Sequence, residues 1–411
     1  MAITPPSELN QTFGDNNRRT LSEGKQKKGY NIGEAPGARH MNYVLSNTAS
    51  FQYALAKALA PQIAFNNFDY TATSTGPANA ADNFHVDYDS LADKFYGVGI
   101  DTSGNQFAVD SADGITWSAN KNVVNVGAGA YGDVSKIVSD GTNCMMAADN
   151  GSSAQVFKSS SLLVAGFPAG GVNVTGNVTS SDLVWDAGNS LWIWCGQNST
   201  PRGTIFTSPA GTTWTSRYTE ASATNMISLA TDGQGNSFAQ NVSGGGRYSS
   251  NGTTWNASTT SPGVSNNVVW SESLQLFVCI ANSNGAVWTS EDGDNWSDMN
   301  AVEGVPFMYN LVHCDDFVLA FTTDLGPSTN GLNYHDVYAF FTEATDRTNF
   351  NYTKIGQVWQ DAGVVEAIPY TSALRSVYRC GQGKVVFPYQ DTSATNDTRM
   401  MVAYYGGPDA F

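Results

Sequence analysis

The chain has 411 residues and a formal net charge of −16. Charged residues make up only 14% of it, about half of what an ordinary globular domain contains. Such an acidic chain is a poor partner for nucleic acid or an anionic membrane surface, because both attract basic proteins. No apolar run reaches the roughly 18 residues of a membrane-spanning helix, and the N-terminus lacks the pattern of a secretory signal. Abundant Gly, Ser, Thr and Asn instead favour many short strands joined by turns.

Residues 1–60 differ in charge from the rest of the chain. They hold seven basic residues against four acidic ones, so they are about +3 while the remainder is about −19. Residues 1–38 show no hydrophobic periodicity, which predicts an extended N-terminal arm that a partner must order. This asymmetry indicates that residues 1–60 have a binding partner of their own.

One short α-helix is expected between about residues 40 and 60. Its apolar stripe contains Val44, Phe51, Leu55 and Leu59. Because an isolated helix of about twenty residues is marginal in water, it needs a surface to pack against. Two interpretations stay open: the helix packs on its own downstream domain, or it serves oligomerisation or docking. Residues 61–82 are polar and predict a linker.

Residues 83–411 contain an internal repeat. A box of the form Ser-x-Asp-Gly-x-Thr-Trp occurs four times with substitutions. Its characteristic residues are Ser111, Asp113, Gly114 and Trp117; Ser208, Gly211 and Trp214; Ser249, Asn251, Gly252 and Trp255; and Ser290, Asp292, Gly293 and Trp296. The tryptophans are 97, 41 and 41 residues apart, so a divergent copy is expected within the longest interval, near Ser159.

The residues around each box predict strands. Asp-Gly or Asn-Gly is typical of a tight turn in which Gly takes a positive φ and the Asp or Asn side chain accepts backbone N–H groups. Four strands every 41 to 50 residues or so is the period of a β-propeller blade. We therefore expect an all-β fold, a β-propeller of about seven four-stranded blades over residues 83–411. We also expect a last strand near Met400–Tyr405 to complete a blade that begins near Phe84 and to close the ring.

The boxes resemble the Asp-box (BNR) repeat of sialidase-like propellers. In that family the box is a structural turn that lies away from the ligand site. The resemblance implies a turn-forming role for Asp113, Asn251 and Asp292. It also implies packing between blades for the four box tryptophans, which are Trp117, Trp214, Trp255 and Trp296.

The sequence shows no catalytic constellation. Sialidases hold their substrate with three arginines, the first in a Phe/Tyr-Arg-Ile/Leu-Pro motif ahead of the first box; the arginines before that box here, Arg18, Arg19 and Arg39, are not in such a motif. A hydrolase with paired carboxylates remains an alternative, and its candidates are Glu220, Glu272, Glu303, Glu343 and Glu366. The histidines and cysteines lack metal-ligand spacing. We expect buried free thiols, no cofactor, no metal and no enzymatic activity.

A segment near the N-terminus resembles the virion-attachment end of bacteriophage tail fibres and other tail proteins. It reads Gly33-Glu-Ala-Pro36-Gly-Ala-Arg39, followed by Met41-Asn-Tyr43-Val-Leu45. In those proteins a G-x-x-P…N-Y-x-L segment leads into a helix and then into a variable C-terminal domain. The resemblance implies that residues 1–60 anchor the protein to other virion tail proteins. It further implies a homo-oligomer, a trimer as such fibres are, made in the host cytoplasm and located in the virion tail.

The sequence thus predicts a tail fibre or appendage whose propeller binds a host surface glycan or protein, without nucleic-acid binding or membrane insertion. A second hypothesis is a purely structural tail protein such as a nozzle, baseplate or adaptor component. The third is a sialidase-like carbohydrate-active enzyme. Candidates for stacking on sugar rings are Trp185, Tyr218, Tyr248, Tyr334, Tyr338 and Tyr352. Trp192 and Trp194 lie in an apolar strand and are expected in the core.

Overall fold

The computed structural model describes residues 80–322 with short gaps and the strand segments between 334 and 404. The chain divides into units 1–60 and 61–411, and every described residue belongs to the second. The predicted arm, most of the linker, and the predicted helix with Val44, Phe51, Leu55 and Leu59 lie outside the described residues. In the described part, no helix is long and apolar enough to cross a membrane.

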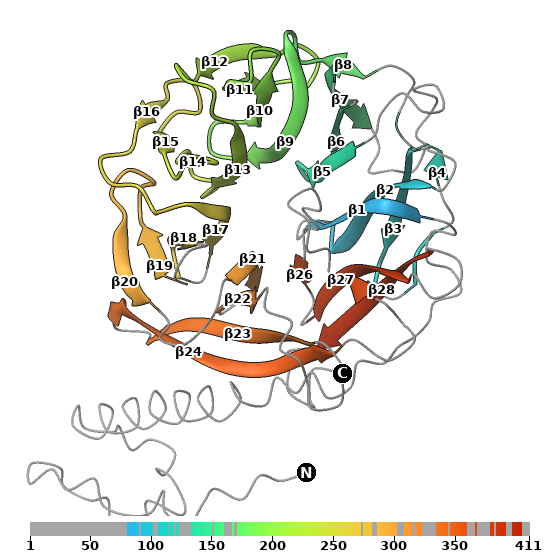
Figure 1. Ribbon diagram of the computed structural model, residues 1–411. Helices are drawn as coiled ribbons and strands as arrows, with labels where there is room; N and C mark the ends of the chain where they lie inside the picture. The colour runs from blue at the N-terminus through green and yellow to red at the C-terminus, as the bar shows by residue number, and fades with distance from the viewer. Residues whose placement is uncertain are drawn as a thin grey trace, which may run out of the picture. The chain divides into compact units, whose positions relative to one another are not determined.

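The described strands form seven sheets, here called blades 1 to 7 in chain order (Figure 1). The strands of blades 1 to 4 are β1 (Ala80–Asp89), β2 (Lys94–Asp101), β3 (Gln106–Ser111), β4 (Lys121–Asn122), β5 (Asp133–Ser139), β6 (Cys144–Asp149), β7 (Ala154–Ser159), β8 (Val172–Asn173), β9 (Asn177–Asp186), β10 (Leu191–Asn198), β11 (Gly203–Ser208), β12 (Thr215–Thr219), β13 (Met226–Thr231), β14 (Ser237–Asn241), β15 (Gly246–Ser249) and β16 (Asn256–Ala257). Those of blades 5 to 7 are β17 (Ser265–Ser271), β18 (Leu276–Ala281), β19 (Ala286–Ser290), β20 (Ser297–Ala301), β21 (Met308–Cys314), β22 (Phe317–Thr322), β23 (Tyr334–Glu343), β24 (Asp346–Trp359), β25 (Glu366–Ala367), β26 (Arg379–Gly381), β27 (Lys384–Asp391) and β28 (Asp397–Tyr404).

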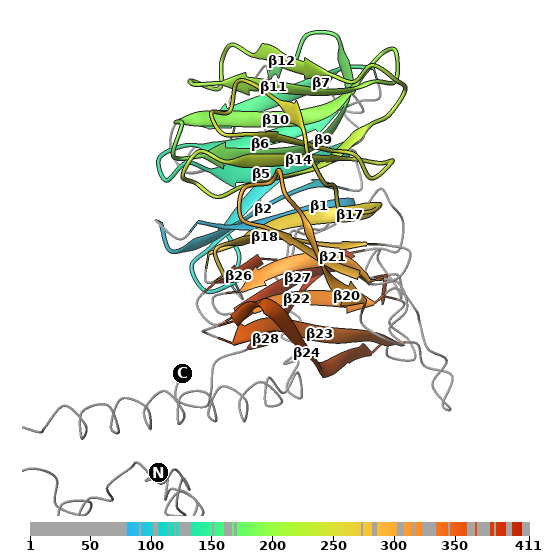
Figure 2. The ribbon, with the colours of Figure 1, turned by 90° about the vertical axis from the view of Figure 1, so that its left-hand side faces the viewer.

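The seven blades are arranged as a ring, which Figure 2 shows edge-on. In blades 1 to 6 the strands pair antiparallel in their order along the chain, and the first strand is innermost. Each inner strand contacts the inner strand of the next blade, and β26 of blade 7 contacts both β21 and β1. The fold is therefore an all-β propeller, as the repeat period predicts.

The predicted closure by strand exchange is wrong. β28 pairs with β27 along its whole length, so the C-terminal strand belongs to blade 7. β1 begins at Ala80, three residues before the predicted domain start, and is the innermost strand of blade 1. Blades 7 and 1 instead meet through side chains, because Val386 of β27 packs with Phe95 and Trp117 of blade 1. This apolar contact joins the first and last blades without a shared sheet.

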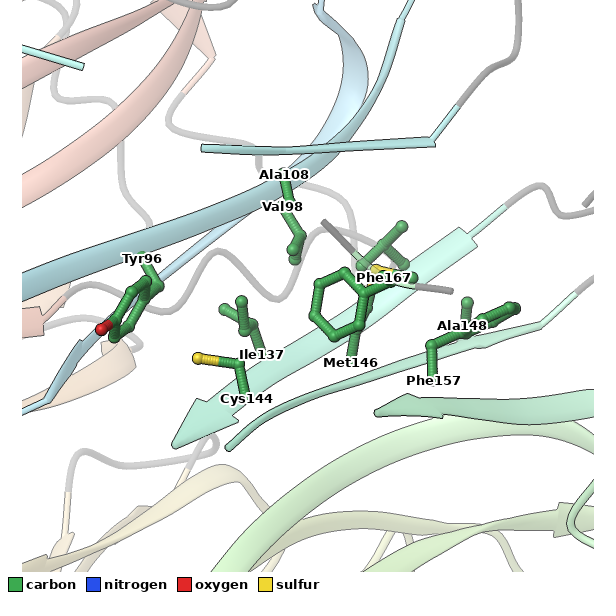
Figure 3. Close-up of a cluster of buried hydrophobic side chains, with 10 residues drawn as sticks. Tyr96, Val98, Ala108, Ile137, Cys144, Met146, Ala148, Phe157 and Phe167 are labelled. Carbon is green, nitrogen blue, oxygen red and sulfur yellow. The ribbon is translucent and has the colours of Figure 1, made fainter. Parts of the chain in front are cut away.

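The second strand of a blade is buried on both faces. In β6, Cys144, Met146 and Ala148 pack towards blade 1, whereas Met145 and Ala147 pack towards blade 3. Figure 3 shows the first of these clusters, in which side chains from β2 and β3 meet those from β5, β6 and β7. Because alternate residues of a strand face opposite sides, a strand between two neighbouring blades must be apolar throughout.

Candidate functional site

The Asp boxes occupy one type of turn, between the third and fourth strands of a blade. In blades 1, 3, 4 and 5 the box serine is the last residue of the third strand. The box tryptophan comes shortly before the fourth strand. In blade 2, where the divergent copy is predicted, Ser159 is the last residue of β7. It pairs with Cys144 of the second strand, as the blade 3 box serine Ser208 pairs with Trp192 of its second strand.

The box of blade 5 shows how the turn is held. Ser290 Oγ accepts the N–H of Gly293 at 2.8 Å, and Asp292 Oδ1 accepts the N–H groups of Asp294 and Asn295 at 2.8 and 2.9 Å. Gly293 has φ of +77°, a conformation that L side chains rarely adopt. Burial opposes ionisation of Asp292, but hydrogen bonds from Asn295 and Asp294 outweigh it and lower the pKa of this carboxyl below 3.8. The carboxylate thus serves the turn.

The other boxes keep this geometry to different degrees. In blades 1 and 4 the acceptors are Asp113 and Asn251, which bind N–H groups three residues ahead at 2.7 and 2.8 Å. Blade 3 has Ala210 at this position, so its turn retains the bond from Gly211 N–H to Ser208 Oγ, at 2.8 Å, without an Asp or Asn acceptor. The Asp or Asn side chain that accepts backbone N–H groups is therefore absent from one of the four boxes.

Each box tryptophan packs against the preceding blade. The ring of Trp296 lies 4.6 Å from that of Phe238 in blade 4. Trp255 packs with the blade 3 core, Trp214 with the blade 2 core, and Trp117 with blade 7. In blades 1, 4 and 5 the indole N–H also donates to the box glycine carbonyl, at 2.9 to 3.3 Å. The boxes therefore join blades in addition to closing turns.

A second turn motif, which the sequence analysis did not identify, follows the inner strand of blades 2, 3 and 4. An Asp accepts backbone N–H groups across the turn through Oδ1, and an Asn three or four residues later donates to Oδ2 at 2.6 to 2.9 Å. The pairs are Asp140–Asn143, Asp186–Asn189 and Asp232–Asn236. Burial raises the pKa of Asp186, although hydrogen bonds from Asn189 oppose the shift. The recurrence of an Asp at the end of a strand, followed three or four residues later by an Asn, is the signal that sequence reasoning missed.

Polar side chains also link the inner strands around the centre of the ring. Lys136 Nζ lies 3.2 Å from Asp182 Oδ1, and Asp182 Oδ2 accepts the N–H of Leu229 at 2.9 Å. Ser228 bonds Asn267, whose amide donates to a carbonyl of β21. Each of these inner strands has a β-bulge in its ladder with the second strand. The groups in this series pair with one another, so they connect successive blades.

Another polar cluster, away from the inner strands, lies between blades 3 and 4. Glu220 accepts hydrogen bonds from Arg247 Nη2 at 2.8 Å, from Tyr218 at 3.0 Å and from Asn241 at 2.9 Å. Arg247 Nε also donates to the Tyr218 hydroxyl, and its guanidinium lies 4.9 Å from the centre of that ring. Glu220 is 5% exposed. Its carboxylate is saturated by structural partners, which makes it a poor candidate for a catalytic acid.

The remaining sequence candidates fall into three groups, which are core aromatics, residues whose side chains are not described, and the exposed Glu272. Trp192 and Trp194 are buried in the core, and Trp185 and Tyr248 are half-buried against neighbouring rings or blade cores. Side chains of the other candidates are outside the described part of the structure, namely Glu303, Glu343, Glu366, Tyr334, Tyr338 and Tyr352. Glu272 is exposed and bonds the indole of Trp270. The described residues contain no group of side chains that could hold a metal ion.

The thiols for which the structure describes side chains are buried, as predicted. Cys144, Cys195 and Cys279 form no disulfide, and each belongs to an inter-blade core. Burial, reinforced by Asp89, strongly raises the pKa of the Cys144 thiol. A thiol with a raised pKa is a weak nucleophile at neutral pH, so Cys144 acts as a small core residue.

The two faces of the ring differ in charge. We call one face of the ring the Asp-box face. It carries the turn between the first and second strands of each blade and the turn between the third and fourth strands. Its described turns in blades 1 to 5, counted with the strand residues that border them, carry one lysine, Lys94, against Asp89, Asp93, Asp113, Asp140, Asp186, Asp232, Glu272, Glu291, Asp292 and Asp294. Lys158 of β7 also reaches this face, where its Nζ donates to Ala210 O at 2.8 Å. We call residues 174–176, 199–202, 221–225, 242–245 and 261–264 the loop face, which lies at the opposite ends of the strands. Arg202 is the one charged residue among them.

Comparison with known proteins bears on the fold. No protein-family model and no curated protein matches the sequence. The β-propeller domain of Cps50 (Swd1) from Myceliophteria thermophila is similar with a TM-score of 0.50 at 10% identity, over 80% of this chain and 98% of that one. A virginiamycin B lyase from Staphylococcus aureus is similar with a TM-score of 0.52 at 6% identity, over 81% of this chain and 96% of that one. These similarities show a β-propeller and leave its function open.

Proposed function

We propose that this protein is a structural component of a bacteriophage virion tail, in which residues 1–60 attach to the tail and the propeller binds the host cell surface. The observation that carries the proposal is the segment Gly33–Leu45, which resembles the attachment end of tail proteins and precedes a propeller. The acidic, charge-poor composition supports a rigid protein that binds neither nucleic acid nor membrane.

The described structure supports binding better than catalysis. Its carboxylates hold turns, as those of Asp186 and Asp292 do, or pair with cations, as Glu220 does with Arg247. A glycosidase needs two carboxyl groups on either side of one substrate bond. Rigid blades that present uncharged loops are instead typical of a scaffold for recognition.

The proposal is tested by removing residues 1–60 from the protein in the phage. We expect the truncated protein to be absent from purified particles, because the anchor is lost, while the full-length protein is incorporated. A substitution confined to the propeller surface, Thr254→Glu, is the matched control and is expected to leave incorporation unchanged. Incorporation of the truncated protein at the normal level would contradict the anchoring role.

Binding to cells separates the two tail-protein hypotheses. The full-length protein, fluorescently labelled, is mixed with intact bacteria of candidate host strains and measured by flow cytometry. Strain-selective binding that survives washing is expected for a receptor-binding fibre or appendage. Incorporation into particles without binding to any strain that the phage infects would favour a nozzle, baseplate or adaptor component.

A further inference from the structure

We propose that the loop face binds a neutral, polyhydroxylated ligand, with the chemistry of an uncharged surface glycan, at a patch centred on Val242 and Val264. The inference rests on the proposed function, because it names the surface and the class of receptor that the propeller recognises. Three observations support it: the exposure of the two valines, the hydrogen bonds that hold their loops in place, and the low charge of the loop face.

Val242 and Val264 are the large hydrophobic side chains that the described residues expose, at 49% and 42%. The turns that contain them are in contact, because a Cβ placed on Gly244, two residues after Val242, would lie 3.0 Å from the backbone nitrogen of Val264. Both are outside the inter-blade cores, so their exposed methyl groups add little to folding. Their methyl groups are therefore accessible to a ligand from solvent.

Hydrogen bonds hold the loops around the two valines in place. The N–H of Val242 donates to Asn225 O at 2.9 Å, which ties blade 4 to the loop that leaves blade 3. The side-chain amide of Gln240 donates to Gly263 O at 2.9 Å, next to Val264. The patch is therefore shaped before a ligand arrives, and binding orders little of the chain.

The charges of the loop face select the ligand class. An anionic ligand needs several cations, whereas Arg202 is the one positive residue among the five described loop segments. A cationic ligand needs accessible carboxylates, and Glu220, which directly precedes the loop segment 221–225, is buried against Arg247. What the patch presents is hydroxyl groups, backbone amides and valine methyl groups. Sugars offer the complementary chemistry, with hydroxyls around an apolar C–H surface.

The small apolar area favours a glycan over a protein partner. Protein interfaces bury on the order of 1,200 Å² or more and are centred on aromatic or arginine residues. The five loop segments contain no aromatic residue. A single weak sugar site is useful in a homo-oligomer, because several linked sites bind one cell with an avidity well above the affinity of each.

The test measures binding of labelled full-length protein to intact cells of a host strain. Val242→Glu combined with Val264→Glu places two charges within the patch. The matched control places two charges on exposed threonines of the Asp-box face, Thr212→Glu with Thr254→Glu. The milder pair Val242→Ser with Val264→Ser removes the methyl surface without adding charge, and near-UV circular dichroism verifies that each variant is folded.

We expect the patch glutamates to reduce binding at least tenfold and the serines to reduce it several-fold, while the control variant binds as the wild type does. Periodate, which oxidises vicinal diols of glycans, should abolish binding when cells are treated with it, and protease treatment should not. Equal binding by wild type and folded patch variants would overturn the patch while leaving the proposed function intact. Loss of binding after protease treatment but not after periodate treatment would overturn the assignment of the ligand as a glycan. Failure of the wild type to bind any host strain would overturn both the patch and the receptor-binding part of the proposed function.

Discussion

The Asp-box face and the loop face differ in what the repeat requires of them. On the Asp-box face, blades 1, 4 and 5 share the same box hydrogen bonds, and blades 2, 3 and 4 share the Asp–Asn turn. On the loop face, the segments 174–176, 199–202, 221–225, 242–245 and 261–264 share no motif. The difference indicates that turn chemistry on the Asp-box face maintains the fold, whereas the described segments of the loop face carry no such shared constraint.

The largest expected effect comes from removing a box tryptophan. Trp296 is 4% exposed and packs on Phe238 of the preceding blade. We expect Trp296→Ala to lower the free energy of unfolding by about 3–5 kcal/mol, because it opens a cavity between two blades. Val264→Ala on the loop face is the control, with a change within about 0.5 kcal/mol. Urea unfolding measures both, and similar values for the two variants would refute the distinction between the faces.

Glycine substitutions compare the faces at the level of the backbone. Gly293 on the Asp-box face has φ of +77°, and an added Cβ would lie 3.2 Å from Phe238 Cβ. Gly263 on the loop face has no positive φ, and an added Cβ would lie 3.7 Å from Ala281 Cβ, an ordinary contact. We expect Gly293→Ala to cost about 1–2 kcal/mol and Gly263→Ala to be neutral or slightly stabilising. Thermal unfolding of both variants checks the difference, and an equal loss in both would contradict it.

The pH dependence of stability should distinguish the two turn motifs. The lowered pKa of Asp292 means that its contribution is present above pH 3.8 and is lost as the pH falls through its folded pKa. The raised pKa of Asp186 acts in the opposite direction: the folded protein binds this proton first, so its contribution grows as the pH falls from neutral towards 3.8.

Unfolding free energies measured against pH for wild type, Asp292→Asn and Asp186→Asn test these signs. The advantage of wild type over Asp292→Asn should shrink below pH 3.8. The comparison of wild type with Asp186→Asn should shift in favour of wild type as the pH falls towards 3.8. Parallel curves for all three proteins would show that neither carboxyl is perturbed by its turn.

The fold was predictable because the Asp boxes, which are strong local sequence signals, recur with the period of a blade. Each box ends a strand, supplies a positive-φ glycine and places a tryptophan at a fixed distance, so four copies indicate the blade. The Asp–Asn turns were missed because single Asp and Asn residues are common in turns, and only the register with the inner strand reveals the equivalence of Asp140, Asp186 and Asp232.

Neither the closure of the ring nor the surface patch could be predicted from local sequence patterns. The strand at Met400–Tyr404 pairs with β27 rather than a blade containing Phe84, and strand propensity does not specify a partner. Val242 and Val264 are 22 positions apart, and no local pattern marks either as exposed. The turns that carry them meet because the turn between the second and third strands of blade 4 contacts the segment that enters blade 5, and this contact depends on the whole ring.

The smallest expected effect is a gain, obtained by completing the deficient box. Ala210 stands where blades 1, 4 and 5 have Asp or Asn, and it is exposed, so a longer side chain needs no cavity. Ala210→Asp supplies an acceptor for N–H groups across the turn, and Lys158 Nζ, bonded to Ala210 O at 2.8 Å, is a favourable neighbour for the new charge. We expect a stabilisation of about 0.5–1 kcal/mol. Asn251→Ala, which removes the equivalent acceptor from blade 4, should cost a similar amount. If chemical denaturation shows a loss for Ala210→Asp, the blade 3 turn differs from the others in more than its missing acceptor.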